Sequence, residues 1–414
     1  MKILLTREQS AKYEEFQQFA AAKIERFAGE WDRAQQIPNE ALSWLGRAGY
    51  LGACIPVKYG GQGWDTVTFG LLNEALGRCD SAITGIVTVQ SMIATPLVKW
   101  GTSEQREQWL PPLARGQIIG AFALTEPEVG SDIQSLATVY RPSDREDVLI
   151  LNGEKKWITC GQFADVFLVF GKLNQKPLAC LVPRNSCGLE IEPIRDLMGF
   201  RAAGLARLHF NDVPVPAANV VGKPGFALSH VAPIGLQYGR ISTACSALGL
   251  LRGCFEESTA HAASRRIAER RVGDLGMIQS LIAKMGSNLE AAGLLCWSAC
   301  RAEDDGLPES FTRTFIAKYF TSRAAVQAAA DAVQIKGASG CHESSPVARY
   351  YRSAKIMEII EGTTQVHELV LGKTFVADAV RRQHLRHRKC EGEPIISASA
   401  SGGLAPNPAA GGLP

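Results

Sequence analysis

A glutamate near the C-terminus stands in surroundings that suit a proton-accepting carboxylate. Glu361 follows the apolar residues Met357, Ile359 and Ile360 and directly precedes Gly362, so it is expected at a helix break in an apolar setting. Burial raises the pKa of a carboxylate, and a carboxylate with a raised pKa can remove a weakly acidic proton. A helical glutamate is also commonly a solvated surface residue, and this stretch taken alone fits either interpretation.

A second segment, residues 121–132 with the sequence AFALTEPEVGSD, ends a predicted strand in a turn rich in hydroxyl groups. Thr125, Ser131 and the backbone N–H groups of such a turn are suited to hold a polar ring or a phosphate. The same hydroxyl groups would equally satisfy the backbone of a capped turn. Trp157, in the sequence WIT, is also open to two interpretations. It fits a ligand site, but a tryptophan in a hairpin is commonly a core residue.

The elements that must position these residues change in type twice along the chain. Before residue 120, apolar residues recur at helical spacing, as at Tyr13, Phe16 and Phe19. Thr6 and Gln9 form a predicted capping box at the start of the first helix. The further helices predicted in this part cover residues 39–48, 67–79, 81–100 and 103–115.

From residue 120 onward, short β-branched runs alternate with turn residues. The runs 148–151 and 156–159 flank Asn152 and Gly153, which predicts a β-hairpin with these two residues as its turn. Further strands are predicted at residues 166–170, 178–182, 189–191 and 205–210.

After Pro233 long helical periods return, in segments rich in small residues that let helices pack closely. The predicted helices cover residues 238–261, 275–301 and 308–335, followed by a break at 337–340 and a last helix from about Pro346. The sequence therefore predicts an α+β protein, with a helical domain at 1–119, a β-domain at 120–232 and a helical domain at 233–380. Residues 381–414 are basic and then rich in Gly, Ala, Pro and Ser, which predicts a disordered tail.

Composition excludes several classes of function. A net charge of +3 on 414 residues is too small to indicate nucleic acid or a membrane surface as the partner. The eleven cysteines include no CxxC pair, so no zinc or other metal site is predicted, and we expect reduced thiols in a cytoplasmic protein. We also expect no membrane span, since no stretch of about 18 uncharged apolar residues is evident.

Taken together and in this order, AFALTEPEVGSD at 121–132, WIT at 157–159 and IIEGTTQ at 359–365 resemble the acyl-CoA dehydrogenase family. The resemblance covers about residues 5–380. It implies a helical N-terminal domain, a small β-barrel-like domain and a C-terminal four-helix bundle, with FAD bound between the β-domain and the bundle.

The resemblance also implies roles for individual residues. Glu361 corresponds to the base that removes the α-proton of an acyl thioester while the β-hydrogen leaves as hydride to flavin N5. Ser131, Arg240 and Gly362 correspond to substrate-binding residues. The residues that correspond to the flavin site are Phe122, Thr125, Ser131, Trp157, Thr159, Arg265, Gln334, Gly337, Gly340, Thr363 and Gln365.

Some members of the family place the base immediately before the arginine that corresponds to Arg240. That position is Gly239 in this chain, and since glycine cannot act as a base, the role falls to Glu361. Arg240 itself fits two interpretations equally well, as a support of the thioester pocket or as a buried arginine in a salt bridge.

The chain departs from the family in the segment that reaches the flavin nucleotide of a neighbouring subunit. Arg265 fits the family pattern, but Ala268 and Glu269 stand where Phe and Gly are usual, and Gly276 stands where Gln is usual. A carboxylate at Glu269 would repel a nearby pyrophosphate unless neighbouring arginines offset it. Cofactor contacts across the predicted homodimer or homotetramer are therefore in question.

The strings YYRSAKIMEIIEGTTQ and QYGRIS resemble a branch of the family that oxidises acyl groups on acyl carrier proteins, as for hydroxymalonyl or aminomalonyl extender units. A coenzyme A ester fits equally well. A carrier protein is acidic, and the basic clusters at 265–271 and 381–389 could meet one or could simply be solvated. The electron acceptor would be an electron-transfer flavoprotein or oxygen. Two other functions remain open, a flavin oxidase or monooxygenase and a non-catalytic scaffold that binds a carrier protein.

Overall fold

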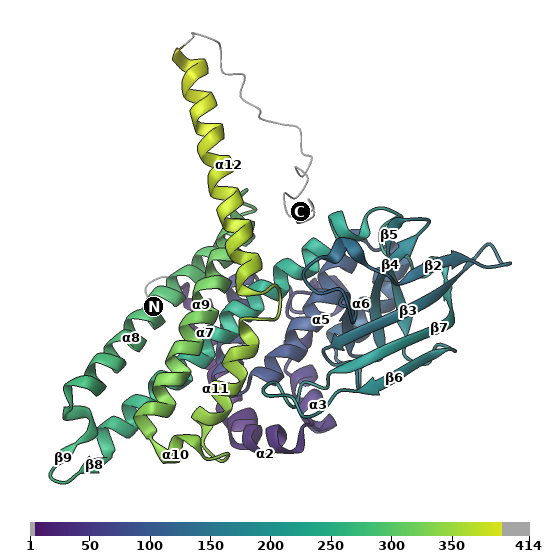
Figure 1. Ribbon diagram of the computed structural model, residues 1–414. Coiled ribbons are helices and arrows are strands. Elements are labelled where there is room, and N and C mark those ends of the chain that lie inside the picture. Colours follow the sequence, from purple (N-terminus) through teal and green to yellow (C-terminus); the bar gives the residue numbers. More distant parts are fainter. Residues whose placement is uncertain (1–4, 391–414) are drawn as a thin grey trace.

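The computed structural model describes residues 5–390 and has helices, then a sheet, then helices again (Figure 1). This confirms the predicted α+β class with a helical N-terminal part, a central curled sheet and a helical C-terminal part.

The N-terminal helices begin where side-chain oxygens cap their first turns. Thr6 and Gln9 form the predicted capping box at α1, and Thr102 and Gln105 form a second box at α6. Asp80 accepts backbone N–H bonds at the start of α5. The helices are α1 (Arg7–Ala20), α2 (Arg26–Ala34), α3 (Asn39–Arg47), α4 (Thr66–Cys79), α5 (Ser81–Trp100) and α6 (Ser103–Ala114), with a π-helical turn, Ala21–Glu25, between α1 and α2.

Helix α5 is the most apolar element of this part. It is long and apolar enough to cross a membrane by length and composition, so the expectation that no such segment exists was wrong. Its side chains from Ser81 to Leu97 are all buried inside the fold. The helix is therefore apolar because it runs through the core and forms one wall of the cavity described below.

Seven strands form one sheet in the described chain, in the order β1-β4-β2-β3-β7-β6, with β5 paired to β4. β1 and β2 run parallel to β4, and the other pairs are antiparallel. The strands are β1 (Gly120–Ala123), β2 (Val139–Pro142), β3 (Val148–Ile158), β4 (Val166–Leu173), β5 (Lys176–Pro183), β6 (Leu189–Pro193) and β7 (Ala206–Pro216).

The predicted hairpin at Asn152 and Gly153 was wrong. β3 runs through both residues as one strand paired with β7, and its register shifts between Leu151 and Gly153. Gly153 has φ +141°, which marks a β-bulge, and its missing side chain leaves room for Thr138, whose Cα would lie 2.8 Å from a Cβ at this position. The Asn-Gly pair bends a strand here instead of ending it.

The C-terminal helices pack on each other and on the N-terminal helices. α7 contacts α4, α5, α8 and α9, so one apolar core is shared by the first and last parts of the chain. The elements are α7 (Ala232–Ser264), a short hairpin of β8 (Arg266–Ile267) and β9 (Arg270–Arg271), α8 (Gly276–Asp304), α9 (Ser310–Lys336), α10 (Ala338–Cys341), α11 (Pro346–Met357) and α12 (Thr364–Cys390).

Glycines let α7 approach α4 closely, as the small-residue content predicts. A Cβ on Gly77 of α4 would lie 2.5 Å from the carbonyl oxygen of Ser246 on α7. A Cβ on Gly249 of α7 would collide with the carbonyl of Glu74. Close packing at these points holds α7, which carries Arg240, at a fixed distance from the N-terminal helices.

Helix α12 runs further than the sequence indicates. It continues to Cys390, so residues 381–390 extend a helix rather than begin a tail, and residues 391–414 lie outside the described chain. Its C-terminal part extends away from the rest of the molecule (Figure 1), and Phe375, Val376 and Val380 near the middle of the helix are exposed. A helix that stands alone in water is only marginally stable. We therefore expect this part of α12 to be a surface for contact with another molecule.

Candidate active site

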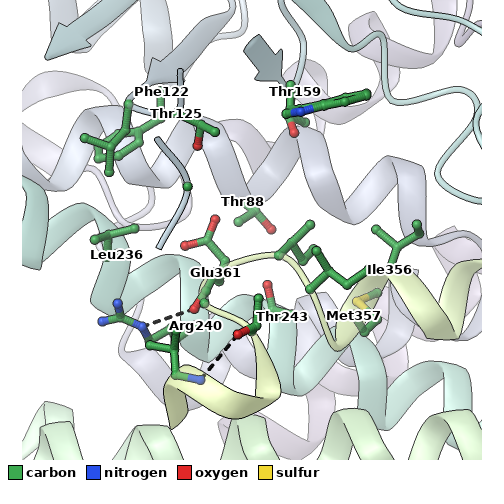
Figure 2. A pocket seen from close by; sticks show the side chains of 18 of the residues that line it. Thr88, Phe122, Thr125, Thr159, Leu236, Arg240, Thr243, Ile356, Met357 and Glu361 are labelled. Atoms are coloured by element: carbon green, nitrogen blue, oxygen red, sulfur yellow. Dashed lines mark hydrogen bonds between the residues drawn. The ribbon is translucent and has the colours of Figure 1, made fainter. Parts of the chain in front are cut away.

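A cavity of about 680 Å³ lies between α5, α7, the sheet and the turn that precedes α12. The lining is mostly apolar, with Val89, Met92 and Leu236 among the residues that face it. Figure 2 shows Glu361 pointing into this cavity, with Thr88 beside it and Phe122, Thr125 and Thr159 on the opposite side.

The turn that carries Glu361 is held in an unusual backbone conformation. α11 ends at Met357, and the backbone then passes through left-handed values at Glu361, φ +55°, and Gly362, φ +96°. Gly362 meets this requirement without steric cost, whereas Glu361 does not, which is a kind of strain common at functional residues. The turn closes when the backbone N–H of Thr364 donates to the carbonyl of Glu358 at 3.0 Å.

The Glu361 carboxylate is buried, and one of its oxygens, Oε2, has no hydrogen-bond partner within residues 5–390. Burial raises the pKa of Glu361 to about 7, and the nearby charges of Arg240 and Lys318 oppose that rise. A carboxylate with this pKa and a free oxygen is suited to accept a proton near neutral pH.

Two buried cations hold the backbone of this turn rather than the carboxylate itself. The Nε of Arg240 donates to the carbonyl of Glu361 at 3.3 Å, and its guanidinium stacks over Phe315 at 4.5 Å. The Nζ of Lys318 donates to the carbonyl of Gly362 at 2.6 Å. Arg240 makes no salt bridge in the described chain, so the pocket-supporting interpretation of this residue fits better than the salt-bridged one.

Gly239 and Glu361 occupy adjoining space. A Cβ at Gly239 would lie 2.7 Å from Cδ of Glu361, so any larger residue there would push the carboxylate aside. A side chain at position 239 and the Glu361 carboxylate would thus occupy the same space beside the cavity. In this chain the glycine leaves room for the glutamate.

The wall opposite Glu361 carries the hydroxyl groups that the sequence singled out. Thr125, Ser131 and Thr159 line the cavity, and none of their hydroxyls has a hydrogen-bond partner in the part of the chain that the structure describes. Trp157 lines the same wall, with φ +62° and 46% of its side chain exposed. That exposure excludes the core interpretation of Trp157 and leaves its indole accessible to a ligand, with the Nζ of Lys156 5.0 Å from the ring centroid.

A buried ion pair holds this wall in place, and the sequence gave no reason to single it out. Lys155 donates to Glu126 at 2.8 Å and to the carbonyl of Leu124 at 3.0 Å. Glu126 also accepts from the backbone N–H groups of Ala137 and Thr138. Although burial opposes it, Lys155 and these N–H groups hold the pKa of Glu126 below its ordinary value. The pair fixes both sides of the turn that presents Thr125.

The structure brings together most, but not all, of the residues predicted for the site. Glu361, Phe122, Thr125, Ser131, Trp157, Thr159, Arg240, Gly362 and Thr363 all line the cavity. The others lie outside it: Arg265, beside the β8–β9 hairpin; Gln334, Gly337 and Gly340, at the end of α9 and in α10; and Gln365, exposed on α12.

The residues around the cavity fit a flavin ring. The free hydroxyls of Thr125 and Thr159 suit the polar edge of an isoalloxazine, and the open indole of Trp157 suits its face. The volume of about 680 Å³ leaves room for a second small group beside the ring. Glu361 then lies across that space from the ring.

The curled sheet and the helical bundle thus enclose a cavity with a buried carboxylate on one side and free hydroxyls on the other. Family models for the acyl-CoA dehydrogenase N-terminal, middle and C-terminal domains match residues 6–117, 121–213 and 229–375. The chain therefore belongs to the acyl-CoA dehydrogenase family, whose members are flavoproteins that act on CH–CH groups.

Individual relatives agree with this assignment over nearly the whole chain. A probable acyl-CoA dehydrogenase, YngJ of Bacillus subtilis, is 33% identical over 91% of this chain and 100% of its own length. The solved structure of butyryl-CoA dehydrogenase from Megasphaera elsdenii is 31% identical, with a TM-score of 0.86 over 90% of this chain and 99% of that one. The structure of FkbI, a protein for biosynthesis of the methoxymalonyl extender unit of the polyketide Fk520, is 30% identical, with a TM-score of 0.80 over 88% of this chain and 99% of that one.

Proposed function

We propose that this protein is an FAD-dependent dehydrogenase of a short acyl thioester, with Glu361 as the base that removes the α-proton. The observation that carries the proposal is the free, buried Oε2 of Glu361, which faces a row of unpartnered hydroxyls across one cavity. The raised pKa of Glu361 suits the abstraction of a weakly acidic proton, because a general base is most effective when its pKa lies near the operating pH.

The residues of the cavity divide into two sets of roles. Phe122, Thr125, Trp157 and Thr159 hold the flavin ring from the sheet side, and Thr363 completes this set from the turn. When bound, the flavin accepts the β-hydrogen of the substrate as hydride.

On the other side of the cavity, Ser131, Arg240 and Gly362 hold the thioester. Apolar side chains from α5 and α7 exclude water from the space between thioester and base. The α-proton then passes to Oε2 of Glu361, which has no competing donor.

The remaining predicted cofactor residues suit a shared site in a homodimer or homotetramer. Arg265, Gln334, Gly337, Gly340 and Gln365 lie away from the cavity of their own chain, so we propose that they contact the FAD of a second copy. The exposed apolar side chains of α12 offer part of the surface for that contact.

The β8–β9 hairpin, where the sequence departs from the family pattern, carries a carboxylate that would disfavour the pyrophosphate of FAD. Ala268, with φ +50°, and Glu269 form the exposed tip between β8 and β9, where Arg266 donates to the carbonyl of Glu269. Four arginines, Arg265, Arg266, Arg270 and Arg271, surround the single carboxylate. We expect them to offset its repulsion of a pyrophosphate.

The similarity to FkbI supports a substrate carried on an acyl carrier protein, whereas the other relatives support a coenzyme A ester. Lys373 on α12 lines the cavity and is exposed, so it is a candidate contact for the phosphate of either carrier. An electron-transfer flavoprotein or oxygen would then reoxidise the flavin.

The test is the visible spectrum of the purified protein, before and after anaerobic addition of butyryl-coenzyme A and of the same acyl group on a carrier protein. The proposal predicts a flavin band that bleaches, and the carrier that bleaches it faster identifies the substrate class. Extraction and chromatography of the flavin should give FAD. Peroxide release in air would identify oxygen as the electron acceptor and favour the oxidase alternative, and protein that remains colourless after addition of FAD would contradict the proposal.

A further inference from the structure

Lys318 is a buried cation to which the sequence drew no attention. It lies in the middle of α9, fully buried, on the face that also buries Thr314, Thr321 and Ala325. Its ammonium group donates to the carbonyl of Gly362 at 2.6 Å, directly after the proposed base. A lysine is rarely buried in this way unless it is paired, because removing an ammonium from water is costly.

No carboxylate pairs with Lys318 in the described part of the chain. The other fully buried lysine, Lys155, donates to Glu126 at 2.8 Å, and Lys336 pairs with Glu257. Lys318 has a carbonyl oxygen as its only hydrogen-bond acceptor among residues 5–390. The nearby carboxylate of Glu361 keeps Oε2 free.

The groups that face this turn come from four elements. Arg240 lies on α7, Lys318 on α9 and His367 on α12, and Glu358 and Glu361 belong to the turn itself. Burial lowers the pKa of His367 to about 3, so the ring is neutral, and Arg240 stays charged. Burial also lowers the pKa of Lys318 to about 7, against the pull of Glu361.

We propose that Lys318 is a positioning residue for the base: its ammonium group holds the Glu361–Gly362 turn by the Gly362 carbonyl, so that the Glu361 carboxylate enters the cavity without a donor of its own. This inference rests on the proposed function of Glu361 and adds to it a second, buried residue that does not touch the substrate. While Lys318 is protonated, below its pKa of about 7, its charge also favours the ionised form of Glu361, which is the form that accepts a proton.

The arrangement solves a conflict between positioning a base and keeping it reactive. A donor on the carboxylate would fix its direction but would also stabilise the charge and weaken the base. A donor on the next carbonyl fixes the left-handed turn and leaves Oε2 of Glu361 without a donor in the described chain. The cost is a buried ammonium group with no carboxylate partner.

The first test reads the carboxyl group directly and needs no substrate. Infrared difference spectra of the FAD-loaded protein against Glu361→Gln, from pH 5 to pH 9, isolate the carboxyl band of Glu361 and its midpoint. Lys318→Met and Lys318→Gln should each raise this midpoint by about 1 pH unit, because a neighbouring positive charge is lost. Lys176→Met removes the same charge from an exposed position on β5 and should leave the midpoint unchanged.

The second test separates positioning from folding. With butyryl-coenzyme A, Lys318→Met should lower kcat for flavin bleaching by about tenfold or more and change KM much less, because the base is displaced while the binding surface is kept. Lys318→Arg, which keeps the charge and a donor, should recover most of the loss.

The outcomes separate this inference from the proposed function. If the natural chain shows no bleaching with any thioester, the proposed function fails, and the carboxyl midpoint still decides whether Lys318 acts on Glu361. An unshifted midpoint in Lys318→Met, or in Lys318→Gln if the first variant does not fold, would overturn the inference. A kcat equal to that of the natural chain in folded Lys318→Met or Lys318→Gln would overturn it as well.

Discussion

The two walls of the cavity each contain a fully buried lysine, and the two lysines are satisfied in different ways. On the sheet side, Lys155 donates to the carboxylate of Glu126 and to a backbone carbonyl. On the bundle side, Lys318 has the carbonyl of Gly362 as its only acceptor among the described residues, and Glu361 keeps an oxygen that none of them contacts by a hydrogen bond. Both lysines fix a turn that presents a functional group to the cavity.

The difference lies in what each carboxylate is left to do. Glu126 accepts from Lys155 and from two backbone N–H groups, which hold its pKa low, and it is structural. Glu361 accepts from none of its cationic neighbours through Oε2, and burial raises its pKa to about 7. In the sheet wall the lysine and the glutamate thus form a structural ion pair. In the bundle wall the lysine donates elsewhere and leaves the glutamate available as a base.

The largest expected difference between the two walls is in stability. Lys155→Met leaves Glu126 buried without its cation and should lower the free energy of unfolding by about 3–5 kcal/mol. Lys318→Met leaves one carbonyl unpaired but removes a buried charge, so its loss should be no more than about 1–3 kcal/mol. Urea unfolding of both variants checks this order, and an equal loss would remove the distinction between them.

A change at Gly239 should disturb only the bundle wall. Gly239→Ala places a methyl group against the Glu361 carboxylate and should slow flavin bleaching by about 10–100-fold, with FAD still bound. Gly253→Ala, further along α7, is the matched control, since its Cβ would meet the carbonyl of Arg78 and the ring of Tyr350, which lie outside the cavity. Normal bleaching by Gly239→Ala would show that the carboxylate does not act from this position.

The pH dependence of bleaching should follow the protonation of Glu361, on the bundle wall of the cavity. Glu361 must be unprotonated to accept a proton, so the rate should rise with pH through about 7 and level off above it. At pH 6 the rate should be about tenfold below its plateau, because only a tenth of the base is then ionised. A rate that stays constant from pH 5.5 to pH 8 would argue against Glu361 as the titrating group.

The smallest expected effect concerns the sheet wall. Trp157 is half exposed, so Trp157→Ala should change the stability of the FAD-free protein by no more than about 0.5 kcal/mol. It should nevertheless weaken FAD binding, because the indole is the open aromatic surface of the site. Fluorescence titration with FAD measures the affinity, and an unchanged value would remove Trp157 from the cofactor site.

Sequence patterns predicted the helical elements and the carboxylate well, for physical reasons. The capping box at Thr6 and Gln9 is a local signal, and local signals survive folding. The apolar run before Glu361 and the glycine after it marked a helix break, and the structure has one there.

Features that depend on tertiary contacts could not be predicted from the sequence. Gly153 reads as a hairpin turn until the partner strand β7 is known, and only then as a bulge. Lys318 sits among apolar residues in FIAKYF, and its role becomes visible only when α9 is placed against the Gly362 carbonyl. The one sequence signal for Lys318 is its helical spacing from Thr314 and Thr321, which places the three residues on one face of α9. The structure shows that this face is buried.

The claim at the centre of this account is that Glu361 removes the α-proton. It is tested most directly by anaerobic stopped-flow spectra of the FAD-loaded natural chain and of Glu361→Gln, mixed with the thioester that bleaches the natural chain fastest. The account predicts that Glu361→Gln keeps its flavin band and loses bleaching by about 10³-fold or more. Bleaching at an unchanged rate would contradict the account and remove Glu361 from the mechanism.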